Sequence, residues 1–196
     1  MHKIVFLGII IFILLNSMKC QNKNEEISET IMEPINDTIC IESPIMARLE
    51  IEKKEKTLTA VLTFANMSEQ DVIVEQNKLG GEKLKEHIFH LNPWYTSPNL
   101  TFKPYNSLLS GKKEKYITMK PQEVIVTYTD LSKYYNFNER SYDTLSISYV
   151  VQMKYLTKEL NQITQKDTDG RTKPVVFYIF SNDIDLDYNK DIKPYL

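Results

Sequence analysis

The chain has 196 residues, of which 42% are apolar and 26% are charged, and its formal net charge is −2. This length and composition suit one globular domain with a hydrophobic core and exclude a disordered chain. The slightly negative charge argues against a nucleic-acid-binding protein, and it becomes more negative if Lys3 and Lys19 are removed with an N-terminal signal.

Residues 1–20 have the pattern of an export signal. A short cationic start precedes an unbroken apolar run over residues 4–15, which is too short to span a bilayer comfortably. Cys20 follows as in bacterial lipoprotein signals, where this cysteine carries the lipid, although Met18 and Lys19 are larger than the residues usual before it. We predict export to the periplasm or outer membrane of a bacterium with a lipid anchor on Cys20; plain secretion is the alternative.

The state of the second cysteine, Cys40, depends on Cys20. If Cys20 is lipidated, Cys40 is a lone thiol; otherwise the two could form a disulfide across the N-terminal segment. Neither case gives a scaffold built on disulfides. Residues 21–45 are polar and acidic without a steady period, so we predict a flexible tether before a domain over residues 46–196.

An alternation of apolar and polar residues recurs along the domain and predicts antiparallel strands. In residues 57–66 it places Leu58, Ala60, Leu62 and Phe64 on one face. Further strands are predicted at residues 46–53, 71–76, 83–91, 100–105, 116–119 and 174–180, and a weak helical pattern covers residues 154–166. The predicted fold is all-β: an antiparallel immunoglobulin-like β-sandwich with a short helical segment near the C-terminal third.

Two strands at residues 123–129 and 144–153 form the centre of the predicted domain. Val124, Val126 and Tyr128 share one face of the first strand, while Ile125, Thr127 and Thr129 share the other. Between the strands we predict a structural corner, because a buried tyrosine with a hydrogen-bonded hydroxyl is a known way to fix a sandwich corner. The residues of this corner are Asp130, Leu131, Tyr134 and Tyr135.

Five short pieces occur in the order found in a known module: the strand ending at residues 64–68, residues 72–74, residues 88–89, a turn at residues 120–123 and the corner at residues 129–135. Over residues 46–153 these pieces resemble the immunoglobulin-like β-sandwich beside the catalytic domain of deuterolysin-type metalloendopeptidases. Gln122 stands where that module has a turn glycine, and Leu145 where a strand tyrosine is expected. The resemblance implies a fold and a secreted habitat without peptidase activity, because no H-E-x-x-H motif is present.

Three local features are candidate functional sites. His87 and His90 form the only close histidine pair. On a strand their spacing places them on opposite faces, and no nearby carboxylate completes a catalytic set, so we expect two surface or rim histidines and no zinc site. The acidic residues 183–191 start like a calcium loop but lack its glycine and its closing glutamate, so we expect no calcium site. Trp94 and Tyr95 could form an exposed recognition loop, or cap the end of the core.

No catalytic triad, phosphate-binding loop or dinucleotide motif is readable. We therefore predict a non-enzymatic, exported binding protein of the cell envelope with a protein partner, without cofactor or metal. One alternative is a proteinaceous inhibitor or immunity protein acting on a secreted enzyme. Another is a metal-dependent hydrolase that uses the histidine pair and the acidic tail.

Overall fold

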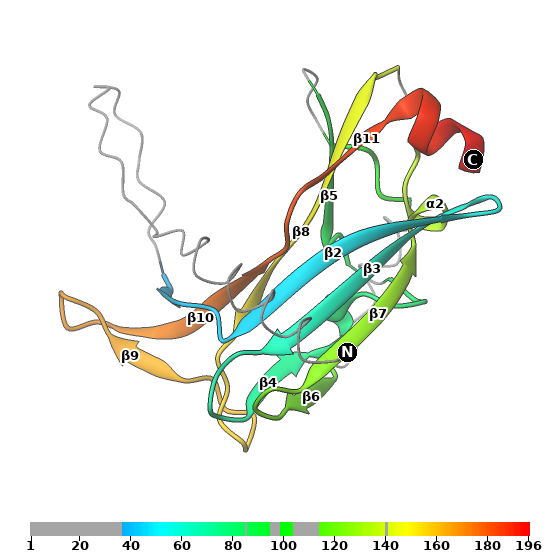
Figure 1. The fold of residues 1–196 in the computed structure, drawn as a ribbon. Coiled ribbons are helices and arrows are strands. Elements are labelled where there is room, and N and C mark those ends of the chain that lie inside the picture. Colours follow the sequence, from blue (N-terminus) through cyan, green and yellow to red (C-terminus); the bar gives the residue numbers. More distant parts are fainter. Residues whose placement is uncertain (1–36, 85, 95–98, 104–113, 140) are drawn as a thin grey trace, which may run out of the picture. The chain divides into compact units, whose positions relative to one another are not determined.

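The computed structural model describes residues 37–84, 86–94, 99–103, 114–139 and 141–196 (Figure 1). These residues form mainly β-strands in a sandwich-like arrangement, which confirms the predicted all-β class. The strands are β1 (Ile39–Ile41), β2 (Ile45–Lys54), β3 (Thr57–Asn66), β4 (Val72–Glu75), β5 (Phe89–Pro93), β6 (Tyr116–Met119), β7 (Val124–Asp130), β8 (Thr144–Lys154), β9 (Thr164–Lys166), β10 (Thr172–Phe180) and β11 (Ile184–Asp187).

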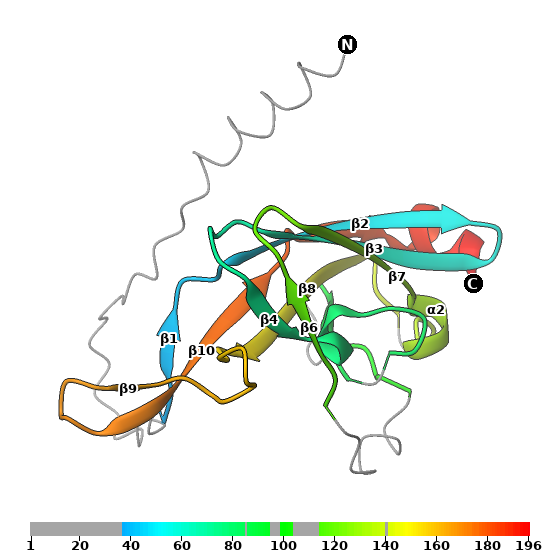
Figure 2. The same ribbon diagram turned by 90° about the horizontal axis from the view of Figure 1, so that it is seen from below.

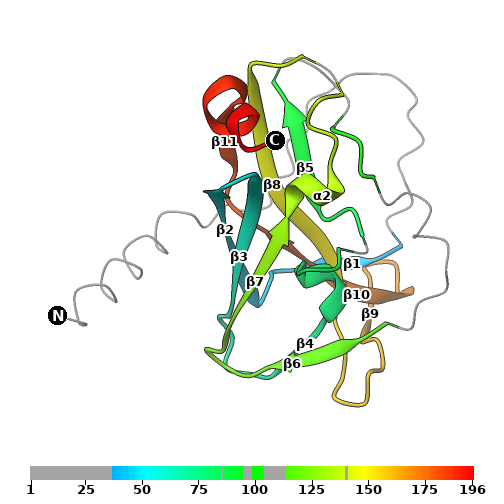
Figure 3. The same cartoon turned by 90° about the vertical axis from the view of Figure 1, so that its right-hand side faces the viewer.

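One sheet contains three antiparallel strands in the order β2-β3-β7 (Figures 1 and 3). Strand β3 has the bounds that the alternation predicts, and its residues Leu58, Ala60, Leu62 and Phe64 are all buried. A two-residue turn joins β2 to β3, and Glu55 within it adopts a left-handed backbone conformation. Because alternate residues of a strand point to opposite faces, this sheet has one core face and one outer face.

The second sheet is built around the long strand β8. Strand β5 pairs with residues 145–149, while β11 and then β10 pair with residues 144–147 and 150–154. Figure 2 shows β1 beside β10, with β9 at the far end of β10. The β1–β10 pair is parallel, whereas the other strand pairs of the described chain are antiparallel.

The core lies between these two sheets. The ring of Tyr149 on β8 meets Phe64 on β3 edge-to-face at 5.4 Å and Phe89 on β5 at 6.1 Å between centroids. A polar link also joins the sheets: the Asn182 side chain, between β10 and β11, accepts from Leu49 N at 2.9 Å and donates to Leu49 O at 3.1 Å. This amide therefore occupies the outer backbone edge of β2.

Asn66, at the end of β3, ties the turn that follows β3 to the turn between β6 and β7, beside the small β4–β6 sheet. Its amide nitrogen donates to Gln70 O at 2.8 Å and Met119 O at 2.9 Å, and its Oδ1 accepts from Ser68 N at 3.0 Å and Ser68 Oγ at 2.8 Å. The residue is 1% exposed. Within residues 64–68, one of the pieces that carry the family resemblance, Asn66 is thus a buried structural residue, whereas Met67 is exposed.

Four short helical segments complete the described chain. Two of them, η3 and η4, form the helical C-terminal end, and Ile192 packs from it into the core. The segments are η1 (Gln76–Leu79), α2 (Leu131–Tyr134), η3 (Tyr188–Ile192) and η4 (Lys193–Tyr195).

The helical pattern read at residues 154–166 was wrong in position. This stretch is a hairpin-like excursion with a bridge between Leu156 and Gln162, followed by β9. Leu160 is 51% exposed in a left-handed conformation, and Thr157 accepts from Leu160 N and Asn161 N. A threonine that bonds to nearby backbone groups offers an alternative to the helix, which outweighs the weak apolar spacing.

Other predicted boundaries also differ from the structure. The strand predicted at residues 83–91 begins only at Phe89, and the one predicted at residues 100–105 is reduced to a bridge between Phe102 and Tyr135, with residues 104–105 outside the described ranges. Within the segment read as a tether, Ile39–Ile41 forms β1. These segments gain their conformation from partners distant in sequence, which local periodicity does not reveal.

Candidate functional site

The corner after β7 is formed by α2 and the residues around it. The Asp130 carboxylate accepts from Ser132 N at 3.0 Å and so caps the helical turn. The side chain of Leu131 is completely buried in the core. Ser132 Oγ accepts from Leu58 N at 3.1 Å, which fixes the corner to the start of β3. Each of these contacts is structural in character.

The two tyrosines of the corner differ in environment. Tyr135 is fully buried and its hydroxyl donates to Phe89 O at 3.1 Å; burial raises the pKa of Tyr135 well above its ordinary value. Tyr134 is less buried and donates to Glu82 O at 2.6 Å. Both rings pack around Phe102, at centroid distances of 5.5 Å for Tyr135 and 6.3 Å for Tyr134. The pair therefore fastens loops to the corner.

The structure brings together the two histidines that the sequence places on opposite strand faces. Their rings stack at 5.9 Å, and His87 also packs against Phe102 and Tyr135. The expected opposite faces were wrong because His87 precedes β5 and does not follow the alternation of a strand, while the expected surface position of both histidines is confirmed. Burial, and then the neighbouring His90, lower the pKa of His87 below its ordinary value. This pair is an aromatic contact at the rim of the corner.

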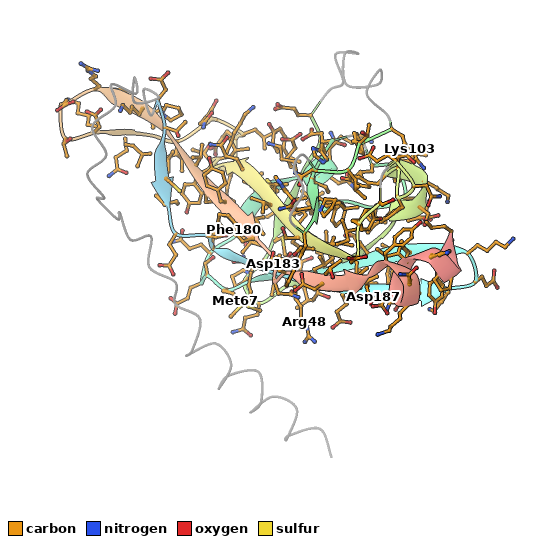
Figure 4. All side chains as sticks on the ribbon, turned by 90° about the horizontal axis from the view of Figure 1, so that it is seen from above. Arg48, Met67, Lys103, Phe180, Asp183 and Asp187 are labelled. Atoms are coloured by element: carbon orange, nitrogen blue, oxygen red, sulfur yellow. The ribbon has the colours of Figure 1, made fainter. Side chains whose placement is uncertain are left out.

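The acidic tail does not gather into one cation site in the described chain. Asp187 accepts from Lys190 N at 3.0 Å and caps η3, while Asp191 forms an ion pair with Lys53 at 2.6 Å. Figure 4 shows Asp183 before the start of β11 and Asp187 at the end of that strand. Across the described residues, no group of three or more histidine, cysteine or acidic side chains could hold a metal ion.

The remaining predicted site residues lie apart from one another. Trp94 follows β5 directly, donates its backbone N–H to Thr144 O at 2.9 Å and is 46% exposed. Tyr95 and Cys20 lie outside the described residues, and Cys40 is an exposed residue of β1. Among the described residues no helix is long and apolar enough to cross a membrane.

A charged cluster that no motif of the sequence indicates lies beside β4, η1 and β6. Lys78 Nζ lies 3.3 Å from Glu75 Oε2 and donates to Gln152 O at 2.9 Å. Burial, followed by the charge of Glu75, raises the pKa of Glu86. Burial, followed by a hydrogen bond to Glu114, raises the pKa of Tyr116 to about 12. The ion pairs within this cluster stabilise charge, and no described histidine or cysteine joins it as a nucleophile or base.

The outer face of the β2-β3-β7 sheet carries an unusual row of side chains. We call Val124, Val126 and Tyr128 the β7 stripe; these side chains are 56%, 45% and 54% exposed. They alternate with residues whose side chains face inward, and all three lie on β7, a terminal strand of its sheet. The stripe was visible in the sequence as one face of an alternating strand, but not as the outer face.

Polar side chains occupy the inner face of β7 instead. Thr127 Oγ1 donates to Leu79 O at 2.7 Å, and Thr129 Oγ1 accepts from Gly81 N at 2.9 Å. Gly80 packs against both threonines in a left-handed conformation, and a Cβ on it would lie 3.0 Å from Thr129 Oγ1. These threonines therefore serve the loop beneath β7; Ile125 shares their inner face and packs against the core, while the side chains of the β7 stripe face solvent.

The outer face changes character from β7 to β2. Register pairing places Met46 in line with Ala65 and Val124, and Arg48 in line with Thr63 and Val126. Arg48 points away from the core (Figure 4) and forms an exposed ion pair with Glu50 at 2.9 Å. The face is thus apolar along β7 and charged along β2.

Comparison with protein-family models and with curated proteins gives no match to this chain. The resemblance to the deuterolysin-associated module therefore stays a prediction, and the candidate functional site is defined by the outer face of the β2-β3-β7 sheet.

Proposed function

We propose that the chain is a non-catalytic binding protein that docks a protein partner through the β7 stripe. The observation that carries this proposal is the inverted polarity of β7: its threonines face inward and its two valines and tyrosine face solvent. Exposing apolar side chains in a row leaves hydrophobic surface that association would remove from water.

The arrangement of the outer face suggests the character of the partner surface. A protein interface commonly has an apolar centre and a polar rim, and tyrosine is enriched at its centre. Tyr128 and the two valines would supply the apolar part, while Arg48 and Glu50 on β2 would supply polar groups at the margin. A partner of this kind presents an apolar strip next to charged or polar side chains.

Catalysis is not favoured by the groups that the described chain offers. The buried acidic group Glu75 is paired with Lys78, Asp191 is paired with Lys53, and Asp187 caps a helical turn. Each of these three carboxylates therefore has a structural task of its own. An inhibitor or immunity protein is a special case of the binding function, and identifying the partner would reveal it.

The proposed location follows from the N-terminal sequence. Residues 1–20 have the pattern of an export signal that ends at Cys20, so we propose binding at the bacterial cell envelope. Mass spectrometry of the mature N-terminus in the native host tests this part. An intact Met1 on soluble cytoplasmic protein would refute export, while an unmodified Cys20 on exported protein would refute only the anchor.

A matched pair of variants tests the docking surface. Val126→Asp places a charge within the β7 stripe, and Met46→Asp places one on the same outer face at the opposite edge of the sheet. Affinity capture from the native envelope, followed by mass spectrometry and binding of the purified candidate, should show that only Val126→Asp loses the partner. Equal binding by both variants would refute docking through the stripe, provided that their thermal melts remain close to that of the unchanged chain.

A further inference from the structure

The backbone of β7 has one edge that no described strand occupies. Asn66 N donates to Glu123 O at 3.0 Å, and the register continues from this pair to Thr59 and Asp130. Because hydrogen-bonded and non-bonded pairs alternate in antiparallel strands, Ile125, Thr127 and Thr129 exchange bonds with β3. The N–H and C=O groups of the β7 stripe therefore point away from β3, toward the unoccupied edge.

Two other sheet edges of the described chain, on β2 and β10, carry protection that β7 lacks. Asn182 bonds both backbone groups of Leu49 on β2, and β1 covers residues 175–177 of β10. Strand β2 also has charged side chains along its length. Residues 124–129 contain no proline, no lysine and no other charged residue. Proline and charged side chains are the usual means by which proteins keep an edge strand unpaired.

The stripe complements itself when it is turned by a twofold rotation. If Val126 faces Val126 of a second antiparallel β7, then Val124 faces Tyr128 at both ends of the pair. Opposed β-branched and aromatic side chains on one face are favourable cross-strand pairs. Asp130 would face Gln122 in this register, so two like charges do not oppose each other.

We propose that the occupant of this edge is a second copy of the chain, paired antiparallel through β7 and centred on Val126. The inference rests on the proposed function and names the partner for the same stripe. Three residues of each copy would exchange backbone hydrogen bonds, joining the two three-stranded sheets into one continuous sheet. The contact is small, so the dimer is a weak one that forms with rising concentration.

Cysteine cross-linking tests the register in the full chain carrying Cys20→Ser and Cys40→Ser, which removes both native thiols. In the proposed pairing the two Val126 Cα atoms are about 5.5 Å apart, a separation that a disulfide can span. Val126→Cys should therefore cross-link with itself under mild oxidation. Val124→Cys lies on the same face with similar exposure, but its two copies would be about 13 Å apart, so it should cross-link only when mixed with Tyr128→Cys.

We expect the cross-linking rate of Val126→Cys to exceed that of Val124→Cys alone by about tenfold or more, because pairing raises the effective thiol concentration. Equal rates for the two variants, or no cross-link for Val126→Cys, would overturn the inference. Sedimentation of the unchanged chain should show a mass that rises with concentration, and Val126→Asp should abolish the rise while Met46→Asp keeps it.

The outcomes separate this inference from the proposed function. A chain that stays monomeric at all concentrations, yet loses a different protein partner on Val126→Asp, refutes the second copy and leaves docking through the stripe intact. A chain that neither dimerises nor loses a partner on that substitution refutes both.

Discussion

Replacing Asn66 should reveal how strongly one buried amide holds the sandwich together. Its side chain makes four hydrogen bonds, to Gln70 O, Met119 O, Ser68 N and Ser68 Oγ, and its backbone separately bonds Glu123 O and Gln122 N. Asn66→Ala keeps the backbone bonds and removes only the side-chain bonds. The substitution therefore isolates the contribution of the amide.

The expected loss of stability depends on the polar groups that Asn66→Ala leaves without a hydrogen-bond partner. Met119 O would lose a partner in a buried setting, which costs about 1–3 kcal/mol, and the partly exposed groups would lose about 0.5–1.5 kcal/mol each where water cannot replace the amide. We expect Asn66→Ala to lower the free energy of unfolding by about 3 kcal/mol, which corresponds to a fall in Tm of about 10 °C for a domain of this size. Urea unfolding followed by circular dichroism measures the change.

The variant Asn66→Asp places a charge at the same buried position. Its ionised carboxylate would face the carbonyl oxygens of Gln70 and Met119, so at neutral pH it should be less stable than Asn66→Ala. These carbonyls and burial raise the pKa of the new carboxyl in the folded state, so the folded protein holds a proton that the unfolded one releases. The deficit relative to the unchanged chain should therefore shrink as the pH falls from 7 toward 4.5. A loss below about 0.5 kcal/mol for Asn66→Ala, or a deficit of Asn66→Asp that is independent of pH, would refute the structural role.

Four further substitutions test the corner, the turn before β7 and the histidine at the rim of the corner. Leu131→Ala should lower the free energy of unfolding by about 2–4 kcal/mol, because it leaves an unfilled cavity in the core. Tyr135→Phe should lower it by about 1–2 kcal/mol, because Phe89 O loses its hydrogen-bond partner. Unchanged urea midpoints would place these side chains outside the core. Gln122→Gly should raise the free energy of unfolding by about 0.5–1 kcal/mol, because Gln122 has a φ of 60° that glycine adopts without strain; a lower Tm would contradict this. Because the pKa of His87 is lowered in the folded state, the folded protein is stabilised above the ordinary histidine pKa and loses this stability as the pH falls below it. His87→Phe should therefore flatten the dependence of Tm on pH between about 5 and 7. A pH dependence equal to that of the unchanged chain would exclude His87 as its cause.

The sequence predicted those strands whose alternation coincides with burial. Residues 57–66 and residues 116–119 have the bounds of β3 and β6, and residues 174–180 lie within β10. The alternation is a local property, whereas pairing is not: β3 meets β7 across about sixty residues of chain, and β1 meets β10 across more than a hundred. The sheet order and the parallel β1–β10 pair were therefore beyond local reading.

The histidine pair shows how a boundary error becomes an error about a site. Reading residues 83–91 as one strand placed His87 and His90 on opposite faces, since strand side chains alternate. In the structure β5 begins at Phe89, and the preceding residues are free to turn His87 back onto Phe102. A shift of the strand start by a few residues thus decides whether two imidazoles lie apart or stack.

Strand β7 marks the limit of what alternation says about function. Its pattern defines two faces, one with valines and a tyrosine and one with an isoleucine and two threonines, and hydrophobicity alone would turn the first face inward. The loop of Leu79, Gly80 and Gly81 decides otherwise, because its backbone needs the hydroxyls of Thr127 and Thr129 as partners. Satisfying those buried backbone groups fixes the inward face, and the β7 stripe must then face solvent. The same hydrogen bonds that complete the loop therefore create the apolar surface on which the proposed binding depends.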